Sequence, residues 1–183
     1  MKTKLLSVVG FSGCGKGVFC RIAHDEFGVT WLSSGAIVRD EMAKRAINST
    51  PQNVRQVSDE IRQRHNGYFL AAMDAQILSV IDEGKNAVID ALREPNDVWY
   101  LRQLLCQTKI IAITANAQER FARINTRKRA GDPLSAEQFG ILHSTEVRLG
   151  VENVMKTADH RLRNERSKHE FEAHCRALLG RLL

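Results

Sequence analysis

Short apolar runs alternate with longer segments of mixed character along most of the chain. The runs have the length of buried strands, whereas the longer segments space their apolar residues as amphipathic helices do. The expected strands cover residues 5–11, 29–32, 87–92, 109–115 and, at an edge of the sheet, 160–163. One expected helix follows the first strand and ends at about residue 27. The other expected helices cover residues 34–47, 50–66, 68–83, 95–105 and 117–130. This alternation predicts an α/β fold with a central parallel sheet, helices on both faces and binding at the carboxyl ends of the strands.

Residues with special backbone preferences mark the ends of these elements. Gly28 and Gly84 stand where a glycine ends a helix, and Thr50 followed by Pro51 provides an N-cap and a first-turn proline. No internal repeat, low-complexity segment or linker interrupts the alternation, and 183 residues with 43% hydrophobic content suffice for one core. We therefore expect a single domain over residues 1–183.

The cysteines and the apolar runs exclude several classes of protein. Cys14, Cys20, Cys106 and Cys175 form no CxxC pair and have no regular spacing, which argues against a disulfide framework and a zinc site. No apolar run approaches the roughly 20 residues of a membrane-spanning helix, and the first residues lack the apolar stretch of a secretory signal. We expect a cytoplasmic protein with reduced thiols and no membrane partner.

The formal net charge of +6 suits a polyanionic partner, and composition alone leaves open nucleic acid, acidic membranes and small phosphorylated molecules. The densest basic run, from Arg123 to Arg129, falls within one expected helix and contains no aromatic residue on which a base could stack. A local clamp for phosphate fits this run better than a nucleic-acid surface does. The sequence does not determine the oligomeric state.

The stretch GFSGCGKGVF, from Gly10 to Phe19, contains a complete GxxxxGK motif between an expected strand and an expected helix. In that context the glycines let backbone N–H groups turn toward an anion, the helix N-terminus adds positive charge, and Lys16 reaches the β and γ phosphates of a nucleotide. The motif therefore predicts ATP binding. The expected ATP-binding residues of this loop are Gly10, Ser12, Gly13, Cys14, Gly15, Lys16, Gly17 and Val18.

Gly17 and Val18 follow the lysine where a Ser or Thr hydroxyl usually meets the metal ion. The variant GxxGxGKG resembles the phosphate loop of adenylate kinases and related nucleoside monophosphate kinases, which usually have Thr where this chain has Val18. We therefore expect Mg²⁺ to be held by ATP oxygens, water and a carboxylate elsewhere. Asp90 is the best candidate, because it ends the apolar run NAVID and leaves its strand where the phosphate loop leaves its own. Asp40 and Glu41 are the alternatives.

Two further segments resemble parts of the same kinases. DALR, from Asp90 to Arg93, resembles DGxR, in which the Asp organises magnesium and the Arg faces the acceptor phosphate. SGAIVR, from Ser34 to Arg39, is similar to the TGDxLR segment that opens the acceptor-binding helices, although Ala36 replaces its Asp. The acceptor-binding residues implied by this resemblance are Ser34, Gly35, Arg39 and Arg93. The two arginines would form a clamp, because guanidinium groups match phosphate oxygens bidentately.

A third segment, RINTR from Arg123 to Arg127, is similar to the RxxxR element at the base of the lid in these kinases. Its spacing puts both arginines on one helical face. By resemblance, Arg123 lies near the adenine, Arg127 contacts the transferred phosphoryl group, and Arg148 is a further contact from the lid. Over most of the chain, the sequence resembles adenylate-kinase-like and dephospho-CoA-kinase-like proteins of archaeal type. The resemblance extends to the tripeptide Ala-Asp-His at residues 158–160. It implies a three-layer P-loop kinase fold with an acceptor-binding helical insert at about 34–83 and a helical lid at about 123–150.

The resemblance implies an ATP-dependent phosphotransferase that moves the γ-phosphoryl group of Mg-ATP to a small phosphorylated acceptor, and it favours a nucleoside monophosphate. Lys16, Arg127 and Asp90 would be the catalytic residues, with Asp90 contacting the metal ion through water. A dephospho-CoA kinase is an alternative with the same loop, and its hydroxyl acceptor would need a carboxylate as general base. An alternative of another class is a nucleotide-binding regulator or RNA-associated ATPase, which the basic composition and the residues Val18 and Ala36 favour.

Overall fold

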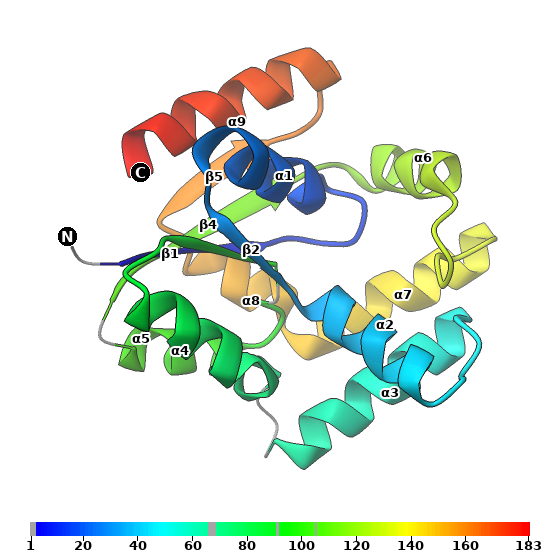
Figure 1. Ribbon diagram of the computed structural model, residues 1–183. Helices are drawn as coiled ribbons and strands as arrows, with labels where there is room; N and C mark the ends of the chain where they lie inside the picture. The colour runs from blue at the N-terminus through cyan, green and yellow to red at the C-terminus, as the bar shows by residue number, and fades with distance from the viewer. Residues whose placement is uncertain (1–2, 66–68, 91, 105) are drawn as a thin grey trace.

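A sheet of five parallel strands in the order β2-β3-β1-β4-β5 runs through the centre of the molecule (Figure 1). The computed structural model describes residues 3–65, 69–90, 92–104 and 106–183. The strands are β1 Lys4–Val9, β2 Thr30–Ser33, β3 Ala87–Asp90, β4 Gln107–Thr114 and β5 His160–Arg163. The central strand β1 aligns Leu5 with Ala87 of β3 and with Thr108 of β4. The parallel α/β sheet expected from the alternating pattern is confirmed.

Helices cover both faces of this sheet. They are α1 Lys16–Phe27, α2 Ser34–Lys44, α3 Pro51–Arg64, the 3₁₀ turn η1 Leu70–Met73, α4 Asp74–Asp82, α5 Pro95–Gln103, α6 Ala117–Arg127, α7 Ala136–Leu149, α8 Val151–Lys156 and α9 Lys168–Leu182. Helices α1 and α9 lie on one face, and α4, α5 and α8 lie on the other (Figure 1). Helices α2, α3, α6 and α7 lie beyond the carboxyl ends of the strands (Figure 1). The result is the three-layer arrangement that the resemblance implies.

Alternation along β1 divides the core into two clusters. Leu5 and Val9 point to the cluster under α4, α5 and α8, whereas Leu6 and Val8 point to the cluster under α1 and α9. Side chains at successive strand positions face opposite sides of a sheet, so one apolar strand can serve both clusters. This is why β1 reads as a continuous apolar run rather than an alternating one.

Helices α2 and α3 share a separate small cluster at the edge of the molecule. Its buried members are Val38, Met42, Val57, Ile61 and Phe69. Helix α4 belongs instead to the main core, since its Ile77 and Val80 pack against the sheet. Within the insert predicted at residues 34–83, α2 and α3 therefore form the part with its own packing.

Several expected elements differ from the structure at their ends. Helix α2 ends at Lys44 rather than near residue 47, because Ala46 adopts a positive φ of 51° and turns the chain back. Helix α6 ends at Arg127 rather than at residue 130, because Lys128 caps it in a left-handed conformation with φ of 44°. The helix expected from residue 68 begins with the turn η1 instead. The ends expected near Asn66 and Gly67, the start at residue 68 and the end at residue 105 lie outside the described residues.

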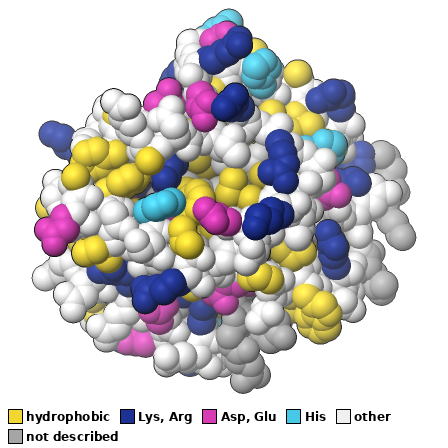
Figure 2. Space-filling view, turned by 180° about the vertical axis from the view of Figure 1, so that it is seen from behind, with side chains coloured by type: hydrophobic (Ala, Val, Ile, Leu, Met, Phe, Trp, Pro, Cys, Tyr) yellow, Lys and Arg dark blue, Asp and Glu magenta, His cyan; other side chains and the backbone are white. Residues whose placement is uncertain are grey.

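Charged side chains are dispersed over the face of the molecule that lies behind the view of Figure 1. On the face shown in Figure 2, basic, acidic and apolar side chains are interspersed, and no continuous basic surface covers it. Among the residues described, no helix is long and apolar enough to cross a membrane. Positive side chains are instead concentrated in a cavity at the carboxyl ends of the strands.

Candidate active site

A cavity of about 990 Å³ opens at the carboxyl ends of the parallel strands. The phosphate loop after β1, the start of α2, the end of β3, the turn after α6 and the segment after β5 all contribute to its walls. This is the position at which open parallel sheets bind ligands, because the connections to the helices diverge there. Of the lining residues, eleven carry positive side chains and four carry negative ones: Lys16, Arg21, Arg39, Arg55, Arg62, Arg93, Arg123, Arg127, Arg129, Arg166 and Lys168 against Asp59, Asp90, Asp132 and Glu146. An anionic ligand fits such a cavity.

The phosphate loop has the backbone shape that its glycines predict. Gly13 and Gly15 have positive φ values of 84° and 115°, and a Cβ on Gly13 would lie only 2.6 Å from the carbonyl oxygen of Arg120. The N–H groups of Gly13, Gly15 and Gly17 donate to no acceptor among the described residues. Free N–H groups in a turn that opens a helix form an anion-binding concavity.

The side chain of Lys16 folds back onto the start of the loop. Its Nζ donates to the carbonyl oxygen of Gly10 at 2.7 Å and lies 3.4 Å from that of Phe11. The ammonium group therefore stays at the mouth of the anion-binding concavity, where it also lines the cavity. Gly10 and Cys14 do not line the cavity: Cys14 is 1% exposed beneath the loop, and its N–H donates to the carbonyl of Phe11. These two residues can shape the concavity without touching a ligand.

Gly17 and Val18 line the cavity as the motif predicts, and neither offers a hydroxyl. Nothing lies within 4 Å of a Cβ built on Gly17, and its φ is not in the left-handed region. The glycine at this position is therefore not required by space or backbone shape. A hydroxyl at Gly17 would fit sterically, although this chain does not carry one.

Asp90 ends β3 beside the phosphate loop. It pairs with Ser33 across the β2–β3 ladder, and the hydroxyl of Ser34 donates to its carbonyl oxygen at 2.9 Å. Its carboxylate lines the cavity and makes no hydrogen bond or ion pair with the part of the chain that the structure describes. Burial raises the pKa of the Cys14 thiol, the charge of Lys16 lowers it and that of Asp90 raises it, so both charges lie near the thiol under the loop.

A single free carboxylate fits a magnesium ion that is held mainly by ATP oxygens and water. Within residues 3–65, 69–90, 92–104 and 106–183, no group of three or more His, Cys, Asp or Glu side chains could hold a metal ion by itself. Mg²⁺ binds in just this way in many nucleotide sites, through one or two carboxylates and the phosphates of the substrate. The two alternatives are less well placed, since neither Asp40 nor Glu41 lines the cavity and Glu41 pairs with Arg64 at 2.9 Å.

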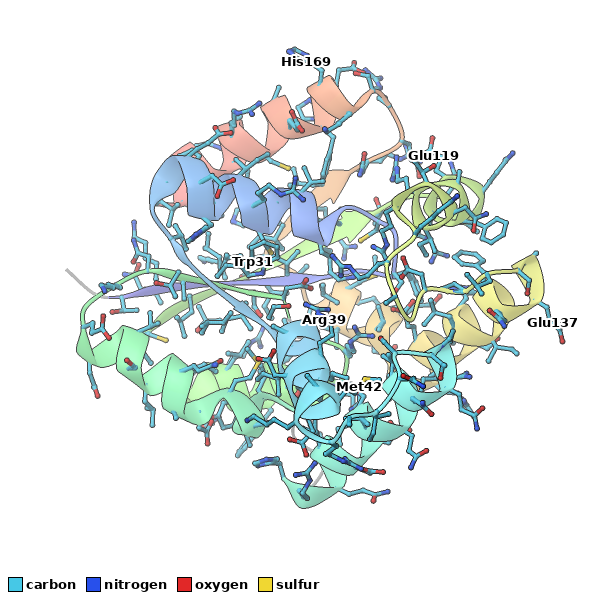
Figure 3. All side chains as sticks on the ribbon, turned by 45° about the vertical axis from the view of Figure 1, so that its right-hand side comes forward. Trp31, Arg39, Met42, Glu119, Glu137 and His169 are labelled. Carbon is cyan, nitrogen blue, oxygen red and sulfur yellow. The ribbon has the colours of Figure 1, made fainter. Side chains whose placement is uncertain are left out.

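The four residues expected to bind the acceptor meet in the cavity. Ser34 and Gly35 line it at the start of α2, and the guanidinium of Arg39 folds back so that a Cβ on Gly35 would lie 3.1 Å from its Nη1 (Figure 3). Arg39 makes no ion pair with any residue in the described ranges. Arg93 reaches the same cavity from the segment after β3, with its Nη1 3.5 Å from Oε1 of Glu146.

Two of the three expected lid arginines, Arg123 and Arg127, line the cavity, and both form hydrogen bonds with other residues. Arg123 donates to Glu119 at 2.8 Å and to the carbonyl oxygen of Asn164 at 2.9 Å. Arg127 forms two parallel hydrogen bonds with the carboxylate of Asp132, at 2.7 and 2.6 Å. A ligand phosphate would have to compete with this carboxylate for Arg127. Arg148 does not line the cavity: its side chain is exposed, and its Nη2 donates to the hydroxyl of Thr145 on α7 at 3.4 Å.

Arg129, the last residue of the basic run predicted to clamp phosphate, also lines the cavity, although no kinase motif assigned it a role. It lies in the turn after α6, and its pKa is lowered by the loss of water around it and then by the positive charges of Arg127 and Arg39. The positive charges of Arg127 on α6 and Arg39 on α2 therefore both act on Arg129, and all three side chains line the cavity. A polyanionic ligand would relieve this repulsion.

Buried polar residues around the phosphate loop also escaped the sequence analysis. Glu146 is 2% exposed and binds the loop at Ser12, and Arg120 is 3% exposed and donates to the Ser12 carbonyl oxygen at 3.2 Å. Asn164 is 6% exposed and donates from Nδ2 to the Cys14 carbonyl oxygen at 2.8 Å. These residues come from α6, α7 and the segment after β5, and no local spacing connects them to the loop.

Comparison with known proteins agrees with this architecture. The family model described as an AAA domain matches residues 9–139. A UPF0200 protein from Hyperthermus butylicus is 35% identical over 178 residues, which cover 97% of this chain and 94% of that protein. The chain belongs to the AAA-domain family and to the UPF0200 family. A second UPF0200 protein, from Thermococcus gammatolerans, is 31% identical over 98% of this chain and 95% of its own length.

Solved structures show that this UPF0200 family member has the P-loop kinase fold. A sugar kinase from Janibacter superposes with a TM-score of 0.67 at 16% identity, covering 97% of this chain and 95% of that one. A dephospho-CoA kinase from Campylobacter jejuni superposes with a TM-score of 0.55 at 17% identity, covering 98% and 97% of the two chains. The expected likeness to kinases is confirmed. At these identities the comparison concerns the fold.

Proposed function

We propose that the chain is an ATP-dependent phosphotransferase that moves the γ-phosphoryl group of Mg-ATP to a small phosphorylated acceptor, with a nucleoside monophosphate as the first candidate. The observation that carries the proposal is the shared cavity. The free N–H groups and Lys16 of the phosphate loop line the same space as Arg39 and Arg93, which come from two other elements. A module that only binds ATP needs the loop, but it does not need a second group of arginines facing it.

The chemistry follows from positioning and charge. Phosphoryl transfer has a loose transition state with charge spread over the phosphoryl oxygens, so fixed positive groups supply most of the catalysis. Lys16 would follow the migrating group, Arg127 and Arg123 would act from the lid side, and Asp90 would orient water around the magnesium ion that neutralises the phosphates. For Arg127 to act, the carboxylate of Asp132 would have to release one of its two hydrogen bonds.

A second candidate is transfer to a hydroxyl group, as in a dephospho-CoA kinase. The observation that favours it is the carboxylate of Asp90, which has no partner among the described residues and faces the cavity as a general base would. A phosphate acceptor needs no such base because its oxygen is already anionic. The two candidates therefore differ in the acceptor group and in the task of Asp90.

The experiment is an acceptor panel. ADP release is measured with Mg-ATP and each ribonucleoside or deoxyribonucleoside monophosphate, and with dephospho-CoA. We expect one class of acceptor to stimulate release. If no acceptor stimulates it, the proposal is wrong and a nucleotide-binding regulator or RNA-associated ATPase becomes the better explanation of the loop.

Variants of the two arginines test the clamp. Each of Arg39→Ala and Arg93→Ala should cost about 1.5 to 3 kcal/mol, or roughly 10-fold to 150-fold in acceptor kcat/KM, since each removes a charged contact to phosphate. ATP affinity should change far less. Arg102→Ala is the matched control, because Arg102 is exposed on α5 and does not line the cavity. Loss of ATP affinity with unchanged acceptor kinetics would instead place the two arginines on the donor side.

A further inference from the structure

The side chain of Glu146 forms hydrogen bonds with Ser12 of the phosphate loop. Both carboxylate oxygens accept the Ser12 backbone N–H, at 3.1 and 3.0 Å, and Oε1 also accepts the Ser12 hydroxyl at 2.7 Å. Glu146 lies on α7, 134 positions away along the chain, and is 2% exposed. A buried carboxylate is costly unless its hydrogen bonds are satisfied, and here the loop supplies most of them.

Arg120 forms a hydrogen bond with the carbonyl oxygen of Ser12. Its Nη1 donates to the Ser12 carbonyl oxygen at 3.2 Å, while its guanidinium carbon lies 4.9 Å and 5.2 Å from the ring centroids of Phe11 and Phe139. Burial lowers the pKa of Arg120, and the charge of Glu146 opposes that shift. Across the described ranges no ion pair joins Arg120 directly to Glu146. Each of the two side chains instead forms a direct hydrogen bond with Ser12.

The hydrogen bonds within and around the loop determine which of its N–H groups remain free for a ligand. Glu146 takes the N–H of Ser12, and Phe11 takes that of Cys14, so Gly13 stands between two occupied groups with its own N–H free. A Cβ on Gly13 would meet the Arg120 carbonyl at 2.6 Å, so the loop also rests directly on α6. The free N–H groups are fixed in direction because their neighbours on the chain are tied down, as anion binding at low entropic cost requires.

The same carboxylate also faces the acceptor side. Oε1 of Glu146, which accepts the Ser12 hydroxyl, lies 3.5 Å from Nη1 of Arg93. Helices α6 and α7, which carry Arg120 and Glu146, flank the turn that holds Arg129 and Asp132. One buried group therefore contacts the loop for the donor and the arginine expected to face the acceptor.

We infer that Glu146 is a positioning residue that fixes the phosphate loop in its ATP-binding shape through Ser12, with Arg120 as the opposing support, and orients Arg93 toward the acceptor. Charge alone would give the opposite effect on ATP binding. A carboxylate beside a triphosphate repels it, so removing the carboxylate charge should tighten binding if electrostatics were its only role. A purely structural role would lower stability and leave the ATP affinity of the folded protein unchanged. Positioning predicts weaker ATP binding in a folded protein.

The test is ATP affinity, measured by calorimetry with the full chain. Glu146→Gln keeps the length of the side chain and removes its charge. We expect its Kd for Mg-ATP to rise about 10-fold, the effect of losing one charge-assisted hydrogen bond. Glu146→Asp should weaken binding as well, because the shorter carboxylate cannot reach Ser12 and Arg93 together. An unchanged or lower Kd in folded Glu146→Gln protein, confirmed by circular dichroism, overturns the inference.

A matched control separates positioning from stability. Glu60 is also partly buried and also pairs with an arginine, Arg45, at 2.6 Å, and neither residue lines the cavity. Glu60→Gln should leave the Kd for Mg-ATP unchanged even where it lowers the melting temperature. If Glu146→Gln does not fold, Ser12→Ala decides, since it removes only the hydroxyl contact and should raise the Kd about threefold. An unchanged Kd in Ser12→Ala would then refute the inference.

The acceptor half of the inference rests on the proposed function. With a stimulating acceptor in hand, the effects of Glu146→Gln and Arg93→Ala on acceptor kcat/KM should be less than multiplicative, because one residue acts through the other. Multiplicative effects would refute the link to Arg93. If no acceptor is found, the proposed function fails, whereas the ATP-binding measurements still decide the role of Glu146 at the loop.

Discussion

Replacing Lys16 by methionine separates the chemistry of the phosphate loop from its folding. The lysine contributes one short hydrogen bond to the fold, from Nζ to the Gly10 carbonyl oxygen at 2.7 Å. Because Lys16 lines the cavity, water can replace the ammonium group there, and the stability loss should be about 1 kcal/mol or less. For a chain of this size that loss lowers the melting temperature by about 2 to 4 °C.

The expected loss of activity is much larger. Lys16 would balance the charge that builds up on the transferred phosphoryl oxygens, and removing such a group costs at least about 100-fold in kcat, or roughly 2.7 kcal/mol of transition-state stabilisation. The assay is acceptor-dependent ADP release under saturating Mg-ATP, with thermal unfolding of the same sample. The large ratio of the kinetic to the thermodynamic effect is the feature to be measured.

Lys4→Met is the matched control for this variant. Nζ of Lys4 donates to a main-chain oxygen of Leu183 at 2.9 Å, so the variant also loses one short hydrogen bond from a lysine to a main-chain oxygen, but Lys4 does not line the cavity. We expect Lys4→Met to show a similar small change in stability and full activity. If Lys16→Met keeps activity within about threefold of the parent, or loses no more than Lys4→Met, then the loop does not act on a transferring phosphoryl group.

Three other predictions concern the loop and its metal ion. Asp90→Asn should raise the magnesium concentration for half-maximal activity about 10-fold, because Asp90 is the carboxylate that we expect to orient the water shell; an unchanged titration would contradict that role. Gly17→Ser should lower this magnesium requirement without loss of stability, since nothing lies within 4 Å of the added Cβ, and a higher requirement would show that the hydroxyl cannot reach the ion. Gly15→Ala should lower the free energy of unfolding, measured with urea, by at least about 2 kcal/mol. The reason is that φ of Gly15 is 115° and that the added Cβ would lie 2.5 Å from Nδ2 of Asn164 and 3.0 Å from Phe171. Stability equal to that of the parent would refute this account of the loop.

The sequence alone determined the order of the elements and the place of the loop. Both depend on short-range signals, namely the period of apolar residues and the glycines that accept positive φ. The end of β3 also predicted Asp90 at the cavity, because parallel strands bring their carboxyl ends to one edge. Arg39 and Arg93 were implied instead by the resemblance of their segments to kinase motifs, and both line the cavity. Their roles remain predictions until the variants are measured.

Tertiary structure decided the ends of the helices and the partners of the charged residues. Helix α6 stops at Arg127, where Lys128 turns left-handed and Asp132 takes both hydrogen bonds of Arg127. Neither event has a strong local signal, since Lys is an ordinary helix former. Arg148, expected to contact the ligand, faces solvent because the direction of α7 is set by its packing and not by its sequence.

Glu146 and Arg120 show the limit most clearly. In the sequence each is a charged residue within an amphipathic helix, which is the usual pattern of a solvated face. Both are buried because the phosphate loop, more than 100 positions away, offers Ser12 N–H, hydroxyl and carbonyl groups that compensate their loss of water. Burial of a charge depends on partners that folding brings from elsewhere in the chain, so no local pattern could reveal it.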